Sequence, residues 1–389
     1  MILSFNTNPG NLNISTGYGY AGYHIVTSLQ KLGYKVPFKY KSAKVQLNFS
    51  QPQFFDLNKD QYQIGYMPWE STQLQEGWLE AFNECDEVWA TSPWVKQVYE
   101  KCGVTPPIHV YEHGIENIWQ PIKRYRKDGP LRFLHVGEPA PRKSGQMTFE
   151  AFVDVFGNDP DYRLTIKSYK YNTIRVYNKY NNIIDSTLTN TYNNISIIPE
   201  EVSTSQMVGI FNSHHCLIYP SWGEGFGFIP LQAMATAMPT ICTSAWANYK
   251  NYLGPLALKS NLIDSPWQHP HLGKVFEPDY KHMVELMRDV AFNFKAYSGY
   301  YFAQSTKIVE EYNWLQLTNK AFDPIFKKLD HHPLYQMDRL DDCDVASLLR
   351  WIKAESINDL PQLDRVDLYE TRGCGAILSW GSLGPAIPV

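Results

Sequence analysis

The sequence predicts an α/β protein made of two parallel sheets with helical crossovers. Short apolar strands alternate with amphipathic helices in two successive sets, and this alternation is typical of parallel sheets. The chain has 389 residues, more than one hydrophobic core usually supports, so two domains are expected. A polar, basic stretch punctuated by proline and glycine, QPIKRYRKDGP at residues 120–130, separates the two sets and is the expected linker.

The first set begins with an apolar run at residues 1–5, expected to be a strand, followed by a glycine-containing loop. In AGYHIVTSLQKLGYKV the apolar residues recur at helical spacing and stop at Gly33. The elements expected next are, in order, the strand QYQIGYMPW, the helix GWLEAFNEC, the strand DEVWATS, the helix PWVKQVYEKCG and the strand IHVYEHGI. In the second of these helices, Pro93 near the first turn and Gly103 at the end are typical boundary residues.

The second set repeats the pattern after the linker. Its expected elements are, in order, the strand LRFLHVG, the helix SGQMTFEAFVDVFG, the strands YRLTIKSY and NISIIPE, the helix SQMVGIFNSH, the strand HCLIYPS, the helix FIPLQAMATAM and the strand PTICTS. Two consecutive parallel α/β sets predict a bilobed protein with a ligand cleft between the lobes.

The remaining segments complete the expected organisation. Residues 171–194 are rich in Asn and Tyr and indicate an insertion or long loop. Residues 281–329 carry amphipathic periodicity and are expected to be mainly helical. The predicted parts are a Rossmann-like N-terminal domain at 1–125, a Rossmann-like C-terminal domain at 126–305, a helix at 306–330 that crosses back to the first domain, and an accessory segment or tail at 331–389.

Composition and charge exclude several classes of protein. The formal net charge of -4 gives no global field for nucleic acid or an anionic membrane. Six scattered cysteines, without CxxC spacing or a nearby His pair, predict neither a disulfide framework nor a zinc site. Nowhere do eighteen apolar residues run together, and the N-terminus lacks a basic start followed by an apolar stretch. A soluble, cytoplasmic protein with reduced thiols is expected.

Two glycine-containing loops of the second set carry the chemistry. HVGEPAPRKSG at 135–145 and the segment from LIYPSWGEGFG at 217–227 each begin where an apolar strand ends, and each opens into a helix. Backbone N–H groups at such helix starts form an anion site, to which Arg142 and Lys143 add positive charge for a diphosphate. The Glu224 carboxylate can accept hydrogen bonds from sugar hydroxyls, and Gln232 follows it by about two helical turns.

These segments resemble the GT-B fold retaining glycosyltransferases of the "glycosyltransferase group 1" (family 4-like) type. PSWGEGFGFIPLQAMATAMPTICT is similar to the family's PS-x-x-EGFG-x-x-x-LEAMA-x-G-x-P-x-I-x-T signature. LRFLHVGEPAPRKSGQMTFEAF resembles the phosphate-binding segment, and DEVWATSPWVKQVYEKCGV…HVYEHGI resembles the end of the first domain. The resemblance covers roughly residues 1–329. It implies two Rossmann-like domains whose parallel sheets face an interdomain cleft.

The resemblance assigns the second domain to the nucleotide-sugar donor. It implies that Arg142 and Lys143 bind the donor diphosphate. It also implies that Glu224 is the first glutamate of an E-x7-E element and lies beside the transferred sugar. Gln232 replaces the second glutamate, which usually holds the ribose; Glu138 and Ala237 are two further departures from the family pattern. The implied donor-binding residues are Gly17, Gly19, Gly137, Arg142, Lys143, Glu224, Gly225, Phe226, Gly227 and Gln232.

The first domain is implied to bind the acceptor. The loop ISTGYGYAG at 14–22 resembles a glycine-rich loop that lies over the donor phosphates. IGYMPWEST falls where many members carry a histidine, so Trp69 and Glu70 are acceptor candidates, with Glu70 also a candidate proton acceptor. His113 in EHGI matches a frequent HG at the interdomain turn and is expected at the hinge or cleft wall. The catalytic candidates are thus Glu70, Arg142, Lys143 and Glu224.

The implied reaction is transfer of a hexose from a nucleotide diphosphate, UDP favoured, with retention of configuration. No Asp-x-Asp segment stands in a suitable loop, so no metal and no prosthetic group are expected. The acceptor stays open between a small molecule, a glycan, a lipid-linked sugar, a protein and a base in DNA; FKYKSAK at 38–44 and KRYRK at 123–127 are the basic segments that a nucleic acid would use.

A binding protein and a dehydrogenase are the competing hypotheses for the chain as a whole. A non-catalytic nucleotide-sugar-binding protein on the same fold stays open because of Gln232. An NAD-type dehydrogenase is disfavoured, since no GxGxxG is followed by an acidic residue at the end of the next strand.

Overall fold

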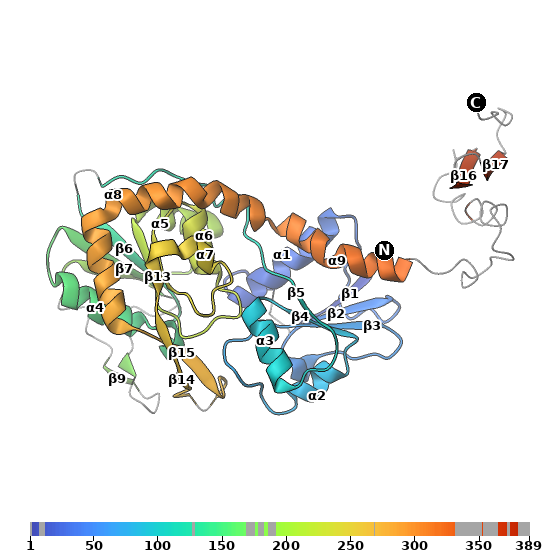
Figure 1. The fold of residues 1–389 in the computed structure, drawn as a ribbon, viewed down its shortest axis with the longest axis horizontal. Helices are drawn as coiled ribbons and strands as arrows, with labels where there is room; N and C mark the ends of the chain where they lie inside the picture. Colours follow the sequence, from blue (N-terminus) through green and yellow to red (C-terminus); the bar gives the residue numbers. More distant parts are fainter. Residues whose placement is uncertain are drawn as a thin grey trace. The chain divides into compact units, whose positions relative to one another are not determined.

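The computed structural model describes residues 2–7, 12–126, 129–168, 192–267 and 269–330 as continuous stretches (Figure 1). It also describes the short segments 176–177, 183–185, 352, 365–371 and 374–379. The chain divides into two compact units, Met1–Ala321 and Phe322–Val389. Both parallel sheets belong to the first unit, so the predicted α/β architecture with two such sheets is confirmed.

A five-stranded parallel sheet forms the first lobe, in the order β1-β2-β3-β4-β5. Its strands are β1 (Leu3–Asn6), β2 (Val45–Phe49), β3 (Tyr62–Tyr66), β4 (Glu87–Ala90) and β5 (Ile108–Val110). The connecting helices are α1 (Gly17–Lys31), η1 (Pro52–Phe54), α2 (Trp78–Asn83) and α3 (Pro93–Cys102). Strands β1, β2 and β4 are buried throughout, as expected where crossover helices cover both faces of a parallel sheet.

A six-stranded parallel sheet forms the second lobe, in the order β10-β7-β6-β11-β12-β13. Its strands are β6 (Leu131–Val136), β7 (Tyr162–Lys167), β10 (Ile195–Ile198), β11 (Cys216–Tyr219), β12 (Thr240–Thr243) and β13 (Ala257–Leu258). Its helices are η2 (Pro141–Lys143), α4 (Gly145–Phe156), α5 (Thr204–Ser213), α6 (Phe228–Ala235), α7 (Lys250–Leu253) and η4 (Gly254–Leu256).

The strand order of the second lobe places its ligand site. From β6 the chain adds β7 and β10 on one side, then returns to add β11, β12 and β13 on the other. The order therefore reverses between β6 and β11, which are paired neighbours. In open α/β sheets, ligands bind beyond the carboxyl ends of the strands at such a switch point. The loops that leave β6 and β11 are the two glycine-containing loops singled out in the sequence.

A hairpin, two helices and two short strand pairs complete the described fold. An antiparallel hairpin, β14 (Ser260–Asp264) with β15 (Lys274–Pro278), follows the second sheet. Helix α8 (Tyr280–Glu311) packs on α4 and α6, with a kink at Asn293, and α9 (Trp314–Asp330) follows it (Figure 1). Two short antiparallel pairs are also described: β8 (Val176–Tyr177) with β9 (Ile183–Asp185), and β16 (Arg365–Thr371) with β17 (Cys374–Ser379).

Helix α1 begins earlier than the sequence indicated. The loop expected at 14–22 ends at Thr16, and Gly17 and Gly19 lie in the first turn of the helix. The reason is a cap: the Thr16 hydroxyl accepts a hydrogen bond from the Gly19 N–H at 3.1 Å. An added Cβ on Gly19 would overlap the Asn13 carbonyl, whereas Gly17 has open space around it. Close packing by the preceding loop therefore explains the glycine at 19 but not the one at 17.

The basic linker segment KRYRK has a structural role at Arg124. This guanidinium is buried and donates to the carbonyls of Phe211 (3.0 Å), His214 (2.7 Å) and Thr236 (3.0 Å). These carbonyls belong to the ends of α5 and α6, where backbone acceptors lack intrahelical partners. Burial lowers the pKa of Arg124 to about 9. The interpretation of this segment as a nucleic-acid contact is therefore wrong for Arg124.

Other expectations concern residues that are only partly described. Most of the Asn- and Tyr-rich insertion at 171–194, and most of the segment at 331–389, lie outside the described residues. The boundaries expected at 125, 305 and 330 stay predictions. None of the described helices is both long and apolar enough to cross a membrane.

Candidate active site

The two switch-point loops bring Arg142, Lys143 and Glu224 together. Residues 137–144 leave β6, make the η2 turn and enter α4, with Ser144 in the left-handed conformation at a φ of 56°. Residues 220–227 leave β11 and enter α6. The Trp222 N–H donates to the Arg142 carbonyl at 3.0 Å, so the two loops are tied to each other directly. Two cations and a carboxylate are thereby fixed beyond the ends of β6 and β11.

Glu224 is the centre of this cluster and is almost fully buried. One of its oxygens, Oε1, lies 2.6 Å from Lys143 Nζ and 3.1 Å from the Arg142 guanidinium. The same oxygen accepts hydrogen bonds from the hydroxyls of Ser221 at 2.6 Å and Tyr219 at 3.0 Å. Burial alone would raise the pKa of Glu224, but Lys143, Arg142 and these donors lower it to about 2. The group is a carboxylate at neutral pH.

Glu70 enters the cluster from the first lobe. Its Oε1 lies 3.8 Å from the Arg142 guanidinium, and its Oε2 lies 3.5 Å from His271 Nε2. Burial raises the pKa of Glu70, but Arg142 and His271 outweigh it and hold the pKa below its ordinary value. Arg142 therefore joins the two carboxylates, and the Coulombic field of both raises its own pKa despite burial. The structure brings together all four residues predicted to be catalytic.

Three glycines let the second loop pack against the first lobe and its own core. A Cβ on Gly223 would overlap the Glu70 carbonyl, and one on Gly225 would lie 2.7 Å from the Trp69 backbone nitrogen. The Thr91 hydroxyl also donates to the Gly225 carbonyl. Gly227 has a φ of 83°, and its Cβ would lie 2.6 Å from the Trp246 ring. The EGFG segment is thus shaped by close backbone approach.

The other predicted residues lie around the cluster. Gly137 keeps the backbone close to Lys143, since an added Cβ would lie 3.2 Å from Lys143 Cβ. Trp69 is 3% exposed and stacks on His271 at 5.6 Å between ring centroids. His113 is 1% exposed, and burial lowers its pKa to about 3, so it is neutral. Phe226 lies against the His113 ring at 5.3 Å.

The Gln232 side chain lies outside the charged cluster, in a different environment. It is 5% exposed and makes a side-chain hydrogen bond with Tyr20 of α1. The Tyr20 hydroxyl also donates to Glu116 at 3.2 Å, and Glu116 in turn pairs with His24 at 3.2 Å. Burial, followed by the nearby Glu116, raises the pKa of Tyr20. The amide at 232 therefore belongs to a hydrogen-bonded contact between the lobes, and its role toward a ribose stays a prediction.

This contact predicts why a glutamate would be unfavourable at position 232. In Gln232→Glu, a second buried carboxylate would share Tyr20 with Glu116, so we expect a loss of about 2–4 kcal/mol at pH 7. Burial and Glu116 would raise the folded-state pKa of the new group. The deficit should then be small below an unfolded-state pKa of about 4.3 and grow as the pH rises. Urea unfolding at several pH values measures it.

Gln206→Glu is the matched control. Gln206 is exposed on α5, and its side-chain oxygen accepts from the Ser203 N–H in a capping box that a carboxylate preserves. We expect a change within about 0.5 kcal/mol for this variant. If Gln232→Glu and the parent chain were equally stable at pH 7, position 232 would not lie in a buried contact with Tyr20.

Several site residues were not identified from the sequence. Ser221 and Tyr219 precede Glu224 in the same strand-end segment, and their position beside the motif was the available signal. Thr91 follows β4 in the same way. His271 had no local signal, because the loop between β14 and β15 brings it to Glu70 from 201 positions away in the sequence.

Metal-ligating residues do not gather in the part of the chain that the structure describes. There, no group of three or more His, Cys, Asp or Glu side chains is placed to hold a metal ion. Cys85, Cys102, Cys216 and Cys242 are free thiols. The charged cluster itself offers two carboxylates, each already paired with a cation.

Comparison with known proteins identifies the fold. No protein-family model matches the chain, and no curated protein matches it in sequence. Sucrose-phosphate synthase from Thermosynechococcus elongatus superposes with a TM-score of 0.59 at 12% identity, over 85% of this chain and 98% of that one. WaaG, a glycosyltransferase involved in lipopolysaccharide biosynthesis, superposes with a TM-score of 0.54 at 10% identity, over 84% of this chain and 99% of WaaG.

A third solved structure is similar over part of its length. The pneumococcal O-GlcNAc transferase GtfA, solved with UDP and GlcNAc, gives a TM-score of 0.52 at 12% identity over 81% of this chain. The match spans 61% of GtfA. The two parallel sheets, their switch-point loops and these similarities together show that the chain has the GT-B fold of glycosyltransferases.

Proposed function

We propose that this protein is a glycosyltransferase that moves a hexose from a nucleotide diphosphate, preferably UDP, to an acceptor, with retention of configuration and without a metal. The observation that carries the proposal is the cluster of Arg142, Lys143 and Glu224 at the switch point, closed by Glu70 from the other lobe. Among proteins of this fold, GtfA was solved with UDP, and trehalose-6-phosphate synthase was studied for glycosyltransfer with retention.

In the proposed mechanism the two cations act on the leaving group. Negative charge develops on the diphosphate as its bond to the sugar breaks, and fixed positive charges stabilise that transition state. Lys143 and Arg142 now pair with Glu224, so a diphosphate would exchange one anionic partner for another. Glu224 then accepts hydrogen bonds from the sugar hydroxyls, held in place by Ser221 and Tyr219.

Glu70 suits acceptor binding better than proton abstraction. A general base works best with a pKa near the working pH, whereas Arg142 and His271 hold the pKa of Glu70 below its ordinary value. An ionised Glu70 accepts a hydrogen bond from the acceptor hydroxyl and orients it. The departing diphosphate, whose terminal oxygens have a pKa of about 6, is the stronger base at the site.

Nucleotide binding and turnover test the proposal together. Thermal unfolding of the full chain would be followed with UDP, GDP and ADP and with their glucose conjugates, each with and without EDTA. At a hundredfold excess over Kd, a true donor stabilises by about 2.7 kcal/mol, which raises Tm by several degrees. The expected result is a shift with a UDP-sugar that EDTA does not remove, and release of UDP over time.

Two outcomes would contradict the proposal in different ways. A shift without any nucleotide release, even with an acceptor panel, would favour a binding protein without catalysis. No shift with any nucleotide would contradict the donor site itself. For an active donor, NMR of the product reports the anomeric configuration, and inversion would contradict retention.

A further inference from the structure

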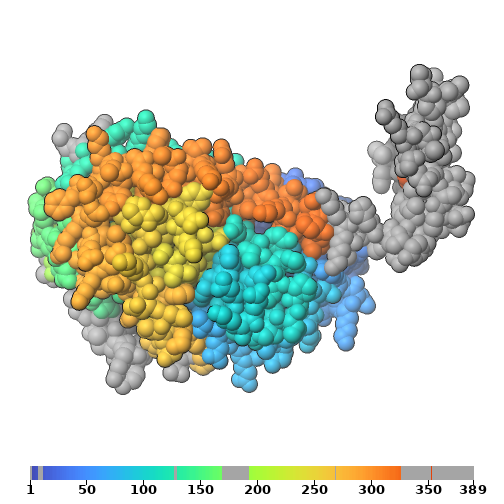
Figure 2. Space-filling view, viewed as in Figure 1, coloured from blue at the N-terminus to red at the C-terminus, as the bar shows by residue number. Residues whose placement is uncertain are grey.

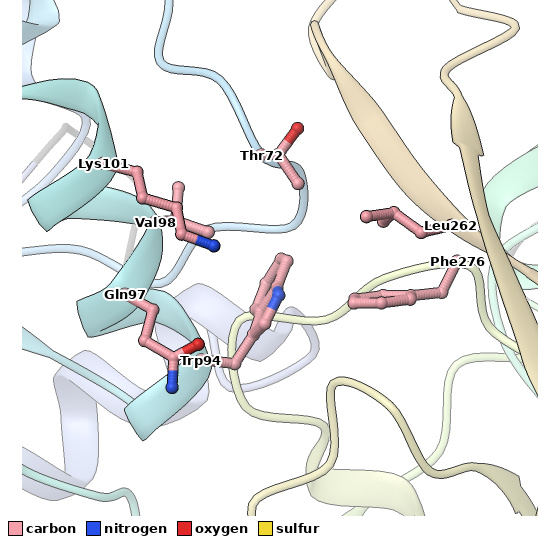
Figure 3. Close-up of a pocket in the computed structure, with 7 residues that line it drawn as sticks. All are labelled: Thr72, Trp94, Gln97, Val98, Lys101, Leu262 and Phe276. Carbon is pink, nitrogen blue, oxygen red and sulfur yellow. The ribbon is translucent and has the colours of Figure 1, made fainter.

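A small groove lies between the lobes, next to the charged cluster. Its volume is about 210 Å³, below the roughly 300–1,000 Å³ of pockets that enclose drug-sized ligands. The space therefore suits one ring rather than an extended chain. Seven residues line it: Thr72, Trp94, Gln97, Val98, Lys101, Leu262 and Phe276 (Figure 3).

The two walls come from different lobes. One wall is a single face of α3, since positions 94, 97, 98 and 101 follow helical spacing. The other wall is the hairpin, with Leu262 from β14 and Phe276 from β15. The rings of Trp94 and Phe276 lie 5.5 Å apart across the boundary. In Figure 2 the surface of α3, in cyan, adjoins the yellow to orange surface of the hairpin segment.

Short backbone segments join the groove to both carboxylates. Thr72 follows Glu70 by two residues, and the Phe276 N–H donates to the carbonyl of Trp222, two residues before Glu224, at 2.8 Å. Two residues span at most about 7 Å of chain. The lobes are also tied at this point, because the Lys274 N–H donates to the Thr72 hydroxyl at 2.7 Å. A molecule in the groove would therefore sit beside the reaction centre.

Two polar side chains of the groove, those of Gln97 and Lys101, are not used elsewhere among the described residues. Gln97 and Lys101 are exposed, and neither side chain has a hydrogen-bond or ion-pair partner among the described residues. Figure 3 shows the Lys101 side chain reaching from α3 toward the space in front of Leu262 and Phe276. By contrast Lys96, on the same helix, lies 3.8 Å from Glu100.

We propose that this groove binds the acceptor, and that the acceptor is a sugar carrying an anionic group. The indole of Trp94 offers an apolar face for the C–H groups of a sugar ring, Gln97 offers hydrogen bonds to hydroxyls, and Lys101 pairs with a phosphate or carboxylate. The ring then lies against Trp94, in a groove whose Thr72 follows Glu70 by two residues. The inference rests on the proposed transfer reaction, whose donor site it leaves unchanged.

Binding of simple acidic sugars to the full chain tests the proposal. Saturation-transfer NMR would use glucose 6-phosphate, glucuronate and neutral glucose as separate probes. Inorganic phosphate, which has no carbon-bound protons, would be titrated as a competitor of the glucose 6-phosphate signal. We expect either acidic sugar to bind more tightly than glucose, and more tightly than inorganic phosphate. Lys101→Met should weaken the binding of the acidic sugars by tenfold or more. Trp94→Leu should weaken the binding of all three sugars. Lys96→Met is the matched control and should bind as the parent chain does.

The outcomes separate this inference from the donor proposal. UDP binding would be measured by thermal shift on the same samples. Two results would overturn the groove proposal and leave the donor proposal intact. In the first, UDP binds but none of the sugars does. In the second, UDP binds and Lys101→Met binds the acidic sugars as tightly as the parent chain does. Equal binding of inorganic phosphate and glucose 6-phosphate would also overturn it, since no ring would then be recognised. If acidic sugars bind while UDP does not, the donor proposal fails and the groove stands.

Discussion

Replacing Lys143 by methionine is expected to lower the rate of sugar transfer by about 10²–10³-fold and to weaken nucleotide-diphosphate binding by at least tenfold. The ammonium is the fixed cation closest to Glu224, and removing one preorganised charge at a developing anion commonly has an effect of this size. Methionine keeps most of the apolar stem, so the lost charge is the main change. Nucleotide release measures the rate, and titration calorimetry measures the affinity.

The same variant has a second readout that does not need the substrate. A pKa of about 2 for Glu224, against an ordinary value near 4.5, corresponds to about 3 kcal/mol in favour of the folded carboxylate. That stability is present above the unfolded-state pKa and is lost as the pH falls toward 2. Without Lys143 the folded pKa should rise, so the variant should gain less stability than the parent between pH 3 and pH 7.

Lys295→Met is the control for both readouts. Lys295 is exposed on α8 and outside the cluster, so its loss should change neither rate nor affinity measurably. Unchanged nucleotide affinity in Lys143→Met would contradict the assigned phosphate site. If affinity falls while the rate does not, Lys143 binds the diphosphate equally in the ground state and the transition state.

The charged cluster could be predicted because its residues stand in two local motifs. Lys143 and Glu224 each follow a strand that ends at the same sheet edge, so the pattern of strands and loops already implied their proximity. Glu70 was predicted through the family resemblance, because the segment that ends β3 falls where many members carry a histidine, whereas its partner His271 was not predicted. His271 reaches Glu70 through a hairpin loop, and long-range packing of this kind leaves no periodic pattern in the sequence.

The fold departs from prediction where a local cap or a buried contact decides the structure. Glycines at 17 and 19 suggested an open loop, but Thr16 caps α1 and draws both into its first turn. The basic segment around Arg124 suggested a solvated linker or a nucleic-acid contact, whereas helix carbonyls surround this guanidinium. In both cases the deciding partner is a group that the residue type alone does not reveal.

Substituting Gly225 by alanine is expected to reduce turnover by about 10²-fold while leaving each lobe folded. The added Cβ would lie 2.7 Å from the Trp69 backbone nitrogen and from Pro68 Cα, so the loop must retreat from the first lobe. Backbone atoms cannot move aside as a flexible side chain can. A displacement of about 1 Å between catalytic groups is enough for such a loss, because transfer needs the acceptor and the donor sugar to be held in the correct relative position. Nucleotide-release assays measure it.

Hydrogen exchange and a second glycine distinguish lobe separation from general destabilisation. In Gly225→Ala the amides near Trp69 and Thr91 should exchange faster, since the hydrogen bond from Thr91 to the Gly225 carbonyl would be lost, while the strands of both sheets keep their protection. Gly209→Ala, on α5 with open space around its Cβ, should stay active and gain up to about 1 kcal/mol of stability. Full turnover in Gly225→Ala would show that transfer does not need this contact between the lobes, and the assignment of Glu70 to the acceptor would then lose its support.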